Sequence, residues 1–176
     1  MATYPFELYP VIAQIAAAFA GFGSLASGLG RRRGGDDARV DASRLSMMLQ
    51  VSLSATLFGL LPATLAGLSV DGPWTLRVSA FAALALILVN APTAARRSIR
   101  FRKLAGFSKR TTVFNGLCLL AALTGFTLCA LGIPADRVGG LYLLGLMGLL
   151  SSSVVMFSRV IISMLRPHSE ADDRAT

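Results

Sequence analysis

Residues 46–67 read SMMLQVSLSATLFGLLPATLAG. The stretch holds no charged residue, and it is long enough to cross a bilayer as a helix, which takes about 20 mostly apolar residues. It nevertheless carries three Ser, two Thr, one Gln and one Pro. This pattern predicts a membrane-spanning helix whose polar groups either line a path through the membrane or form hydrogen bonds to other helices.

Apolar stretches of similar length recur along the chain of 176 residues. Hydrophobic residues make up 54% of the sequence and charged residues only 15%, whereas charged residues are about 25% of an ordinary soluble domain. We therefore predict an all-α, polytopic integral membrane bundle with five transmembrane helices. It forms one domain over residues 1–166 and is followed by a disordered cytoplasmic tail, 167–176. The expected spans are 10–30, 45–68, 74–95, 112–133 and 140–162.

The basic residues alternate between connections, and this alternation predicts the threading of the chain. Segment 31–44 holds five Arg and three Asp, and segment 96–110 holds seven Lys or Arg and no acid, whereas 69–73 and 134–140 have no excess of positive charge. Because basic connections stay on the cytoplasmic side, we expect the N-terminus outside and the C-terminus inside. In an alternative reading the first stretch lies on the membrane surface, although it has no charged face to present to water.

The two basic segments are expected to differ in structure. Segment 31–44 contains two adjacent glycines, which predicts a flexible loop, and its Asp spacing matches no calcium or zinc site. Segment 96–110 interleaves aromatic and aliphatic residues with cations, which is typical of chain in the headgroup region. We expect membrane lipids, anionic at the cytoplasmic face, as partners and no nucleic acid. The expected lipid contacts are Arg96, Arg97, Arg100, Arg102, Lys103, Lys109 and Arg110.

The sequence offers little for catalysis. The single histidine, His168, lies in the tail, and no Asp, Glu or Lys falls inside an expected span. Paired carboxylates, Ser-His-Asp arrangements and histidine-ligated metals in the membrane are therefore not expected. We predict a non-enzymatic protein without catalytic residues, metal or cofactor. The Arg-rich, Lys-poor composition indicates a bacterial inner (plasma) membrane as its location.

A few polar residues are expected at a similar depth, in the cytoplasmic third of the spans. Such residues either form a pocket open to the cytoplasm or, equally in keeping with their type, bond to neighbouring helices and interfacial water. The candidate pocket residues are Ser46, Gln50, Ser54, Asn90, Asn115 and Arg159.

A helical-wheel arrangement of residues 46–67 separates three sets of side chains. The first is a candidate packing seam: Ser52, Thr56, Gly59, Ala63 and Gly67. The second is a candidate pore constriction: Leu53, Leu57 and Leu61. The third is an apolar face expected to meet lipid: Met47, Val51, Phe58 and Leu65. Pro62 should leave the carbonyl of Phe58 without its helical donor.

Small residues recur at helix-packing spacing in other spans, as Ala121, Gly125, Cys129 and as Gly145, Gly148, Ser152. Packing inside one bundle is the simpler explanation, and contact with another subunit is the alternative. The main functional hypothesis is association through helices, either as a homo-oligomer or as an accessory subunit of a larger membrane complex, and Gly59→Leu should then break the assembly. The alternative is a small homo-oligomeric channel lined by residues 46–67. Lipid handling is a third hypothesis, for which the sequence identifies no lipid-sized groove.

Overall fold

The computed structural model describes residues 7–30, 36–68, 72–101 and 109–165. Each of the long helices in these ranges contains a window that is long and apolar enough to cross a membrane. The prediction of an all-helical chain with five helices long and apolar enough to span a membrane is therefore confirmed for the part of the chain that the structure describes. The elements are α1 (Leu8–Gly30), α2 (Asp36–Gly67), α3 (Gly72–Phe101), α4 (Lys109–Leu131), the short 3-10 helix η1 (Ala135–Arg137) and α5 (Val138–Leu165).

Two helices extend beyond their expected spans by more than one turn. α2 begins at Asp36 instead of Leu45, and α3 continues to Phe101. The prediction of a loop over 31–44 is therefore wrong from residue 36 onward. No Gly or Pro separates Asp36 from the apolar span, and extending an existing helix costs far less than nucleating one. The expected disordered tail, 167–176, lies outside the described residues.

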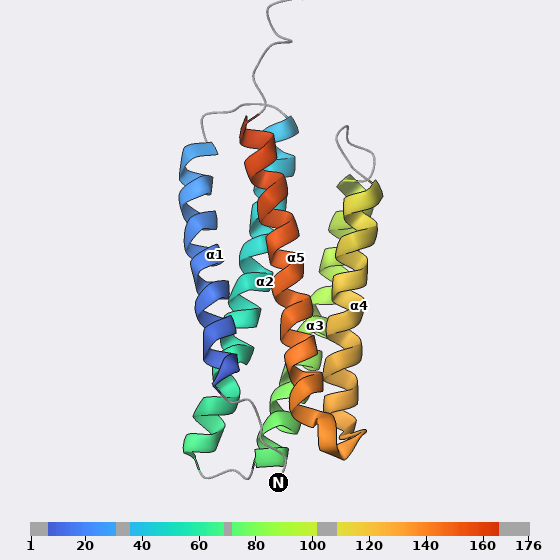
Figure 1. Cartoon of the computed structure of the whole chain (residues 1–176). Helices are drawn as coiled ribbons and strands as arrows, with labels where there is room; N and C mark the ends of the chain where they lie inside the picture. The colour runs from blue at the N-terminus through green and yellow to red at the C-terminus, as the bar shows by residue number, and fades with distance from the viewer. Residues whose placement is uncertain (1–6, 31–35, 69–71, 102–108, 166–176) are drawn as a thin grey trace, which may run out of the picture.

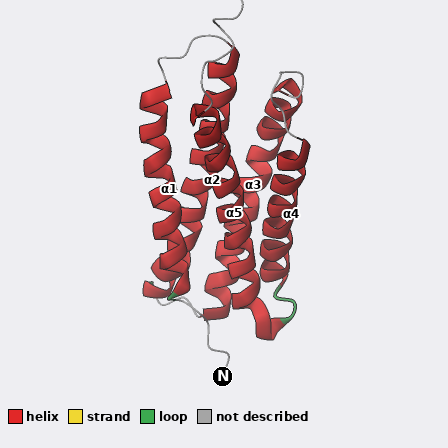
Figure 2. Ribbon diagram, turned by 45° about the horizontal axis from the view of Figure 1, so that its top comes forward, coloured by secondary structure: helices red, strands yellow, loops and turns green. Residues whose placement is uncertain are grey.

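The helices form an antiparallel bundle in which α5 contacts each of the other four long helices (Figures 1 and 2). α1 and α4 lie on opposite sides of it. α1, α3 and α5 end, and α2 and α4 begin, at the same end of the bundle, which we call the basic end because segments 31–44 and 96–110 lie there. The opposite end, with connections 69–73 and 132–137, is called the neutral end.

The buried core joins side chains from all five long helices. Its largest members include Tyr9, Phe58, Leu76, Phe126 and Tyr142, and they lie toward the neutral end. The Phe126 and Tyr142 rings pack edge to face with centroids 5.5 Å apart, an arrangement that aromatic pairs prefer. A smaller cluster of Leu45, Met48 and Val160 lies nearer the basic end.

Glycines let α4 and α5 approach closely. A methyl group on Gly125 would lie 2.7 Å from the backbone of Leu141 and Gly145, and one on Gly148 would lie 2.7 Å from the carbonyl oxygen of Cys118. These distances are too short for any side chain. The small-residue rows of these two spans therefore pack helices of the same chain, as expected when lipid removes the hydrophobic drive between helices.

Candidate functional site

Two of the six candidate pocket residues meet between α2 and α3. The Gln50 side-chain amide donates from Nε2 to Asn90 Oδ1 over 2.6 Å, and Asn90 Nδ2 donates to the Leu86 carbonyl over 2.8 Å. Gln50 is exposed and Asn90 half-buried, so this amide pair, Gln50 and Asn90, lies on the outside of the bundle. It falls within the apolar windows of both helices.

Two further candidates lie between α4 and α5. Ser152 donates its hydroxyl to Asn115 Oδ1 over 2.6 Å, and Arg159 Nη2 donates to the Thr111 hydroxyl. The last two candidates form no interhelical bond among the described residues: Ser54 donates to the Gln50 carbonyl of its own helix over 2.8 Å, and Ser46 is exposed. The contacts therefore divide the six residues into an α2–α3 pair and an α4–α5 group, instead of joining them around one pocket.

The first three members of the candidate packing seam contact other helices of the same chain. The buried Ser52 hydroxyl bonds to that of Ser153 in α5. Thr56 Oγ1 lies 3.4 Å from the Ala13 carbonyl oxygen of α1. A methyl group on Gly59 would lie 2.9 Å from the carbonyl oxygen of Tyr9. Gly59→Leu would therefore disturb the α1–α2 contact of the monomer, so the variant does not isolate assembly.

The remaining seam residues, Ala63 and Gly67, are exposed. On Gly67 a methyl group would meet nothing within 4 Å. This face of α2 has no partner helix among the described residues.

The side chains of the candidate constriction and of the expected lipid face do not all point where the helical wheel predicts. Leu53 and Leu57 are 59% and 55% exposed, whereas Leu61 packs against the core. Phe58 is only 2% exposed, so its assignment to a lipid-facing side is wrong. The reason is that its ring packs against Phe126 of α4, with centroids 6.5 Å apart.

A buried polar cluster at the neutral end was not predicted. The Tyr142 hydroxyl donates to the Phe58 carbonyl over 2.6 Å, and this is the carbonyl that Pro62 deprives of a helical donor. Tyr9 donates to the Gly139 carbonyl over 3.2 Å, and its ring packs edge to face on Tyr142. The freed carbonyl was visible in the sequence, but its donor was not.

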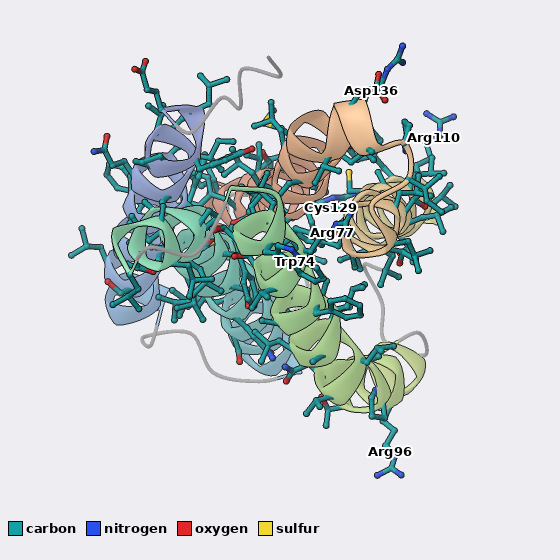
Figure 3. All side chains as sticks on the ribbon, turned by 90° about the horizontal axis from the view of Figure 1, so that it is seen from below. Trp74, Arg77, Arg96, Arg110, Cys129 and Asp136 are labelled. Atoms are coloured by element: carbon teal, nitrogen blue, oxygen red, sulfur yellow. The ribbon has the colours of Figure 1, made fainter. Side chains whose placement is uncertain are left out.

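Arg77 of α3 also lies at the neutral end and was not predicted as a site residue. Its guanidinium lies 5.4 Å from the Trp74 ring and against Gly132, where α4 ends with φ of 69°. Figure 3, seen from the neutral end, shows Arg77 and Cys129 side by side between α3 and α4. Arg77 Nε is buried without a hydrogen-bond partner among the described residues. A cation at a helix C-terminus is favoured by the helix dipole, which explains this position.

The expected anionic-lipid contacts are only partly visible. Arg96 and Arg110 are exposed at the basic end, and Arg96 points away from the bundle (Figure 3). The side chains of Arg97, Arg100 and Lys109 lie outside the described set, as do residues Arg102 and Lys103. Among the side chains that the structure describes, no three His, Cys, Asp or Glu gather in one place.

Comparisons with protein-family models, with curated proteins and with solved structures give no match to this chain.

Proposed function

We propose that this protein works without catalysing a reaction, by associating through its helices with further copies of itself or with partner membrane subunits. The observation that supports the proposal is the position of the amide pair, Gln50 and Asn90, on the outside of α2 and α3. It lies inside apolar windows, where polar atoms facing hydrocarbon are costly.

The amide pair leaves hydrogen-bonding capacity unused. An amide side chain has two N–H donors and a carbonyl acceptor. Gln50 uses one donor, and Asn90 uses its acceptor and one donor. Within the described part of the chain the side-chain carbonyl oxygen of Gln50, Oε1, has no partner. A second copy related by a two-fold axis presents the same donors and acceptors, so the pair is self-complementary.

Two other polar groups of α2 are already used inside the monomer. Ser52 bonds to Ser153 and Thr56 approaches the Ala13 carbonyl. Ala63 and Gly67 are small residues that remain exposed on α2, and small side chains permit close approach of another helix. The amide pair near the basic end and the exposed small residues near the neutral end would thus both contribute to association through α2.

Gln50→Leu tests the proposal, with association measured in lipid bilayers by single-molecule photobleaching at several protein densities. Two symmetric interhelical hydrogen bonds at about 0.6 kcal/mol each predict that the substitution weakens a dimer about eightfold. Gln14→Leu is the matched control, because Gln14 is an exposed amide on α1. Unchanged association of Gln50→Leu, or equal weakening by Gln14→Leu, contradicts the proposal. If a different protein co-purifies from native membranes in a fixed stoichiometry, the surface that carries the amide pair binds that partner instead of a second copy.

The proposed orientation is N-terminus outside and C-terminus inside, in a bacterial inner membrane. Its support is the excess of Arg and Lys in segments 31–44 and 96–110, because basic connections stay on the cytoplasmic side. Cysteines introduced at Ala2 and Ala175, in a chain lacking Cys118 and Cys129, test it through labelling of intact cells. An impermeant maleimide should react only at position 2, and the reverse pattern would refute the orientation.

A pore is the second candidate, and the exposure of Leu53 and Leu57 favours it. Both leucines lie on the outside of α2, and Gln50 is exposed nearer the basic end. In a ring of copies with α2 facing the axis, the two leucines would form a constriction that gates by dewetting. Leu61 would not take part, because it packs inside. Single-channel current from reconstituted protein that Leu57→Trp abolishes would rank this function first.

A further inference from the structure

The helices α4 and α5 lie together at the neutral end and diverge toward the basic end (Figure 1). Their contacts change in the same order along the helices. Close backbone contact at Gly125 and Gly148 gives way to the Ser152–Asn115 hydrogen bond and then to the Arg159–Thr111 bond. Arg is among the longest side chains, and here it reaches across the widened gap.

This divergence leaves a groove of about 400 Å³ on the outside of α4 and α5 at the basic end. Arg110, Thr111, Ser158 and Arg159 line its polar part. The apolar part is lined by Phe114, Val154, Val155 and Ile162. A second hollow of about 360 Å³ shares Arg110 and Phe114 and continues along α4 to Leu117. We call the two together the α4–α5 groove.

The charged and the apolar side chains of this groove lie at different depths along α4 and α5. Phe114 lies one turn deeper into α4 than Arg110, and Val155 one turn deeper into α5 than Arg159, which is about 6 Å in each helix. Arg110 is exposed, and Arg159 uses one hydrogen bond to Thr111, whereas a guanidinium carries five N–H donors. The acidic side chains that the structure describes, Glu7 and Asp136, lie at the neutral end.

We infer that the α4–α5 groove binds an anionic phospholipid, whose phosphate contacts Arg110 and Arg159 and whose acyl chains lie against Phe114 and Val155. Guanidinium groups are well suited to phosphate oxygens, and basic pockets between helices at the membrane surface are typical sites for anionic headgroups. The apolar floor explains why a lipid fits better than a soluble phosphate. The site is defined by the basic end alone, so it does not depend on which way the bundle is inserted or on self-association.

Tryptophan quenching tests this site directly, because Trp74 is the only tryptophan in the chain. The variant Trp74→Phe, Phe114→Trp carries its single tryptophan in the groove. It is reconstituted in phosphatidylcholine bilayers that contain increasing fractions of brominated phosphatidylglycerol or, in parallel, brominated phosphatidylcholine. Each arginine can strengthen the binding of an anionic lipid about fivefold. The binding constant of the anionic lipid should therefore be about 5- to 25-fold that of phosphatidylcholine. Equal quenching by the two lipids overturns the inference.

Matched variants distinguish binding in the groove from a general attraction of anionic lipid to the cationic surface. Arg110→Gln should lower the preference for phosphatidylglycerol about fivefold, whereas Arg96→Gln, which removes an exposed cation outside the groove, should leave it unchanged. Val155→Phe keeps both arginines and fills the apolar part, so it should also lower the preference. Equal effects of Arg96→Gln and Arg110→Gln, or displacement of the lipid by excess inorganic phosphate, overturn the inference.

Discussion

Replacing Tyr142 by Phe removes one hydroxyl and nothing else from the core. The ring contacts with Tyr9 and Phe126, at centroid distances of 5.4 and 5.5 Å, remain available to the Phe side chain. The substitution removes the 2.6 Å hydrogen bond to the Phe58 carbonyl and the contact of the hydroxyl with the Ser79 side chain. Because Pro62 has no N–H, that carbonyl is then left without a donor in a water-poor core.

The expected cost follows from these contacts. A hydrogen bond between membrane helices contributes about 0.6 kcal/mol on average and about 1.7 kcal/mol at most, and a buried acceptor left unpaired costs about 1–3 kcal/mol. We expect Tyr142→Phe to lower the free energy of unfolding by about 1–2 kcal/mol. In a Pro62→Ala background the residue 62 amide can donate to the Phe58 carbonyl, so the same substitution should cost less than about 0.6 kcal/mol.

The assay is reversible unfolding in mixed detergent micelles, followed by circular dichroism, for the four proteins of this double-mutant cycle. The coupling between positions 62 and 142 should be about 1 kcal/mol, since contacting residues do not contribute additively. Tyr9→Phe serves as the control, because Tyr9 donates to Gly139 and its cost should not depend on residue 62. The same cost for Tyr142→Phe in both backgrounds would refute the account.

The same unfolding measurement checks two glycine positions. Gly125→Leu should destabilise the fold by about 1–3 kcal/mol or more, because even a methyl group there would lie 2.7 Å from the α5 backbone. Gly116→Leu is the control and should change the free energy of unfolding by no more than about 0.5 kcal/mol, because a methyl group there meets nothing within 4 Å. Equal costs for the two variants would contradict the packing of α4 on α5. The backbone at Gly132, with φ of 69°, should make Gly132→Ala cost about 1–2 kcal/mol. An Arg77→Ala background should keep this backbone cost, although it removes the overlap between the added methyl group and the Arg77 guanidinium.

The candidate site was predictable in parts. Gln50 and Asn90 were picked out as amides at a similar depth, and the structure joins them by a hydrogen bond. Asn115 and Arg159 were picked out on the same grounds, but they contact Ser152 and Thr111 between other helices. Depth along a helix follows from residue number, whereas lateral position depends on which helices are neighbours.

The α4–α5 groove was not predictable from residue types. Arg110 and Arg159 are 49 residues apart in the chain and belong to helices that could have packed closely along their whole length. The groove arises because glycines hold α4 and α5 together only toward the neutral end. The sequence shows these glycines, but it does not show that the two helices diverge.

The sequence by itself determined that the chain forms five long apolar helices and that its cationic connections gather at one end, because the transfer of a segment into lipid depends mainly on its own residues. Only the tertiary structure decided which side of each helix faces inward. Phe58 shows the reason: an apolar side chain suits lipid and core alike, so hydrophobicity does not distinguish the two surfaces of a membrane helix. The close fit of small residues and a few polar contacts, such as Tyr142 to the Phe58 carbonyl, make that choice.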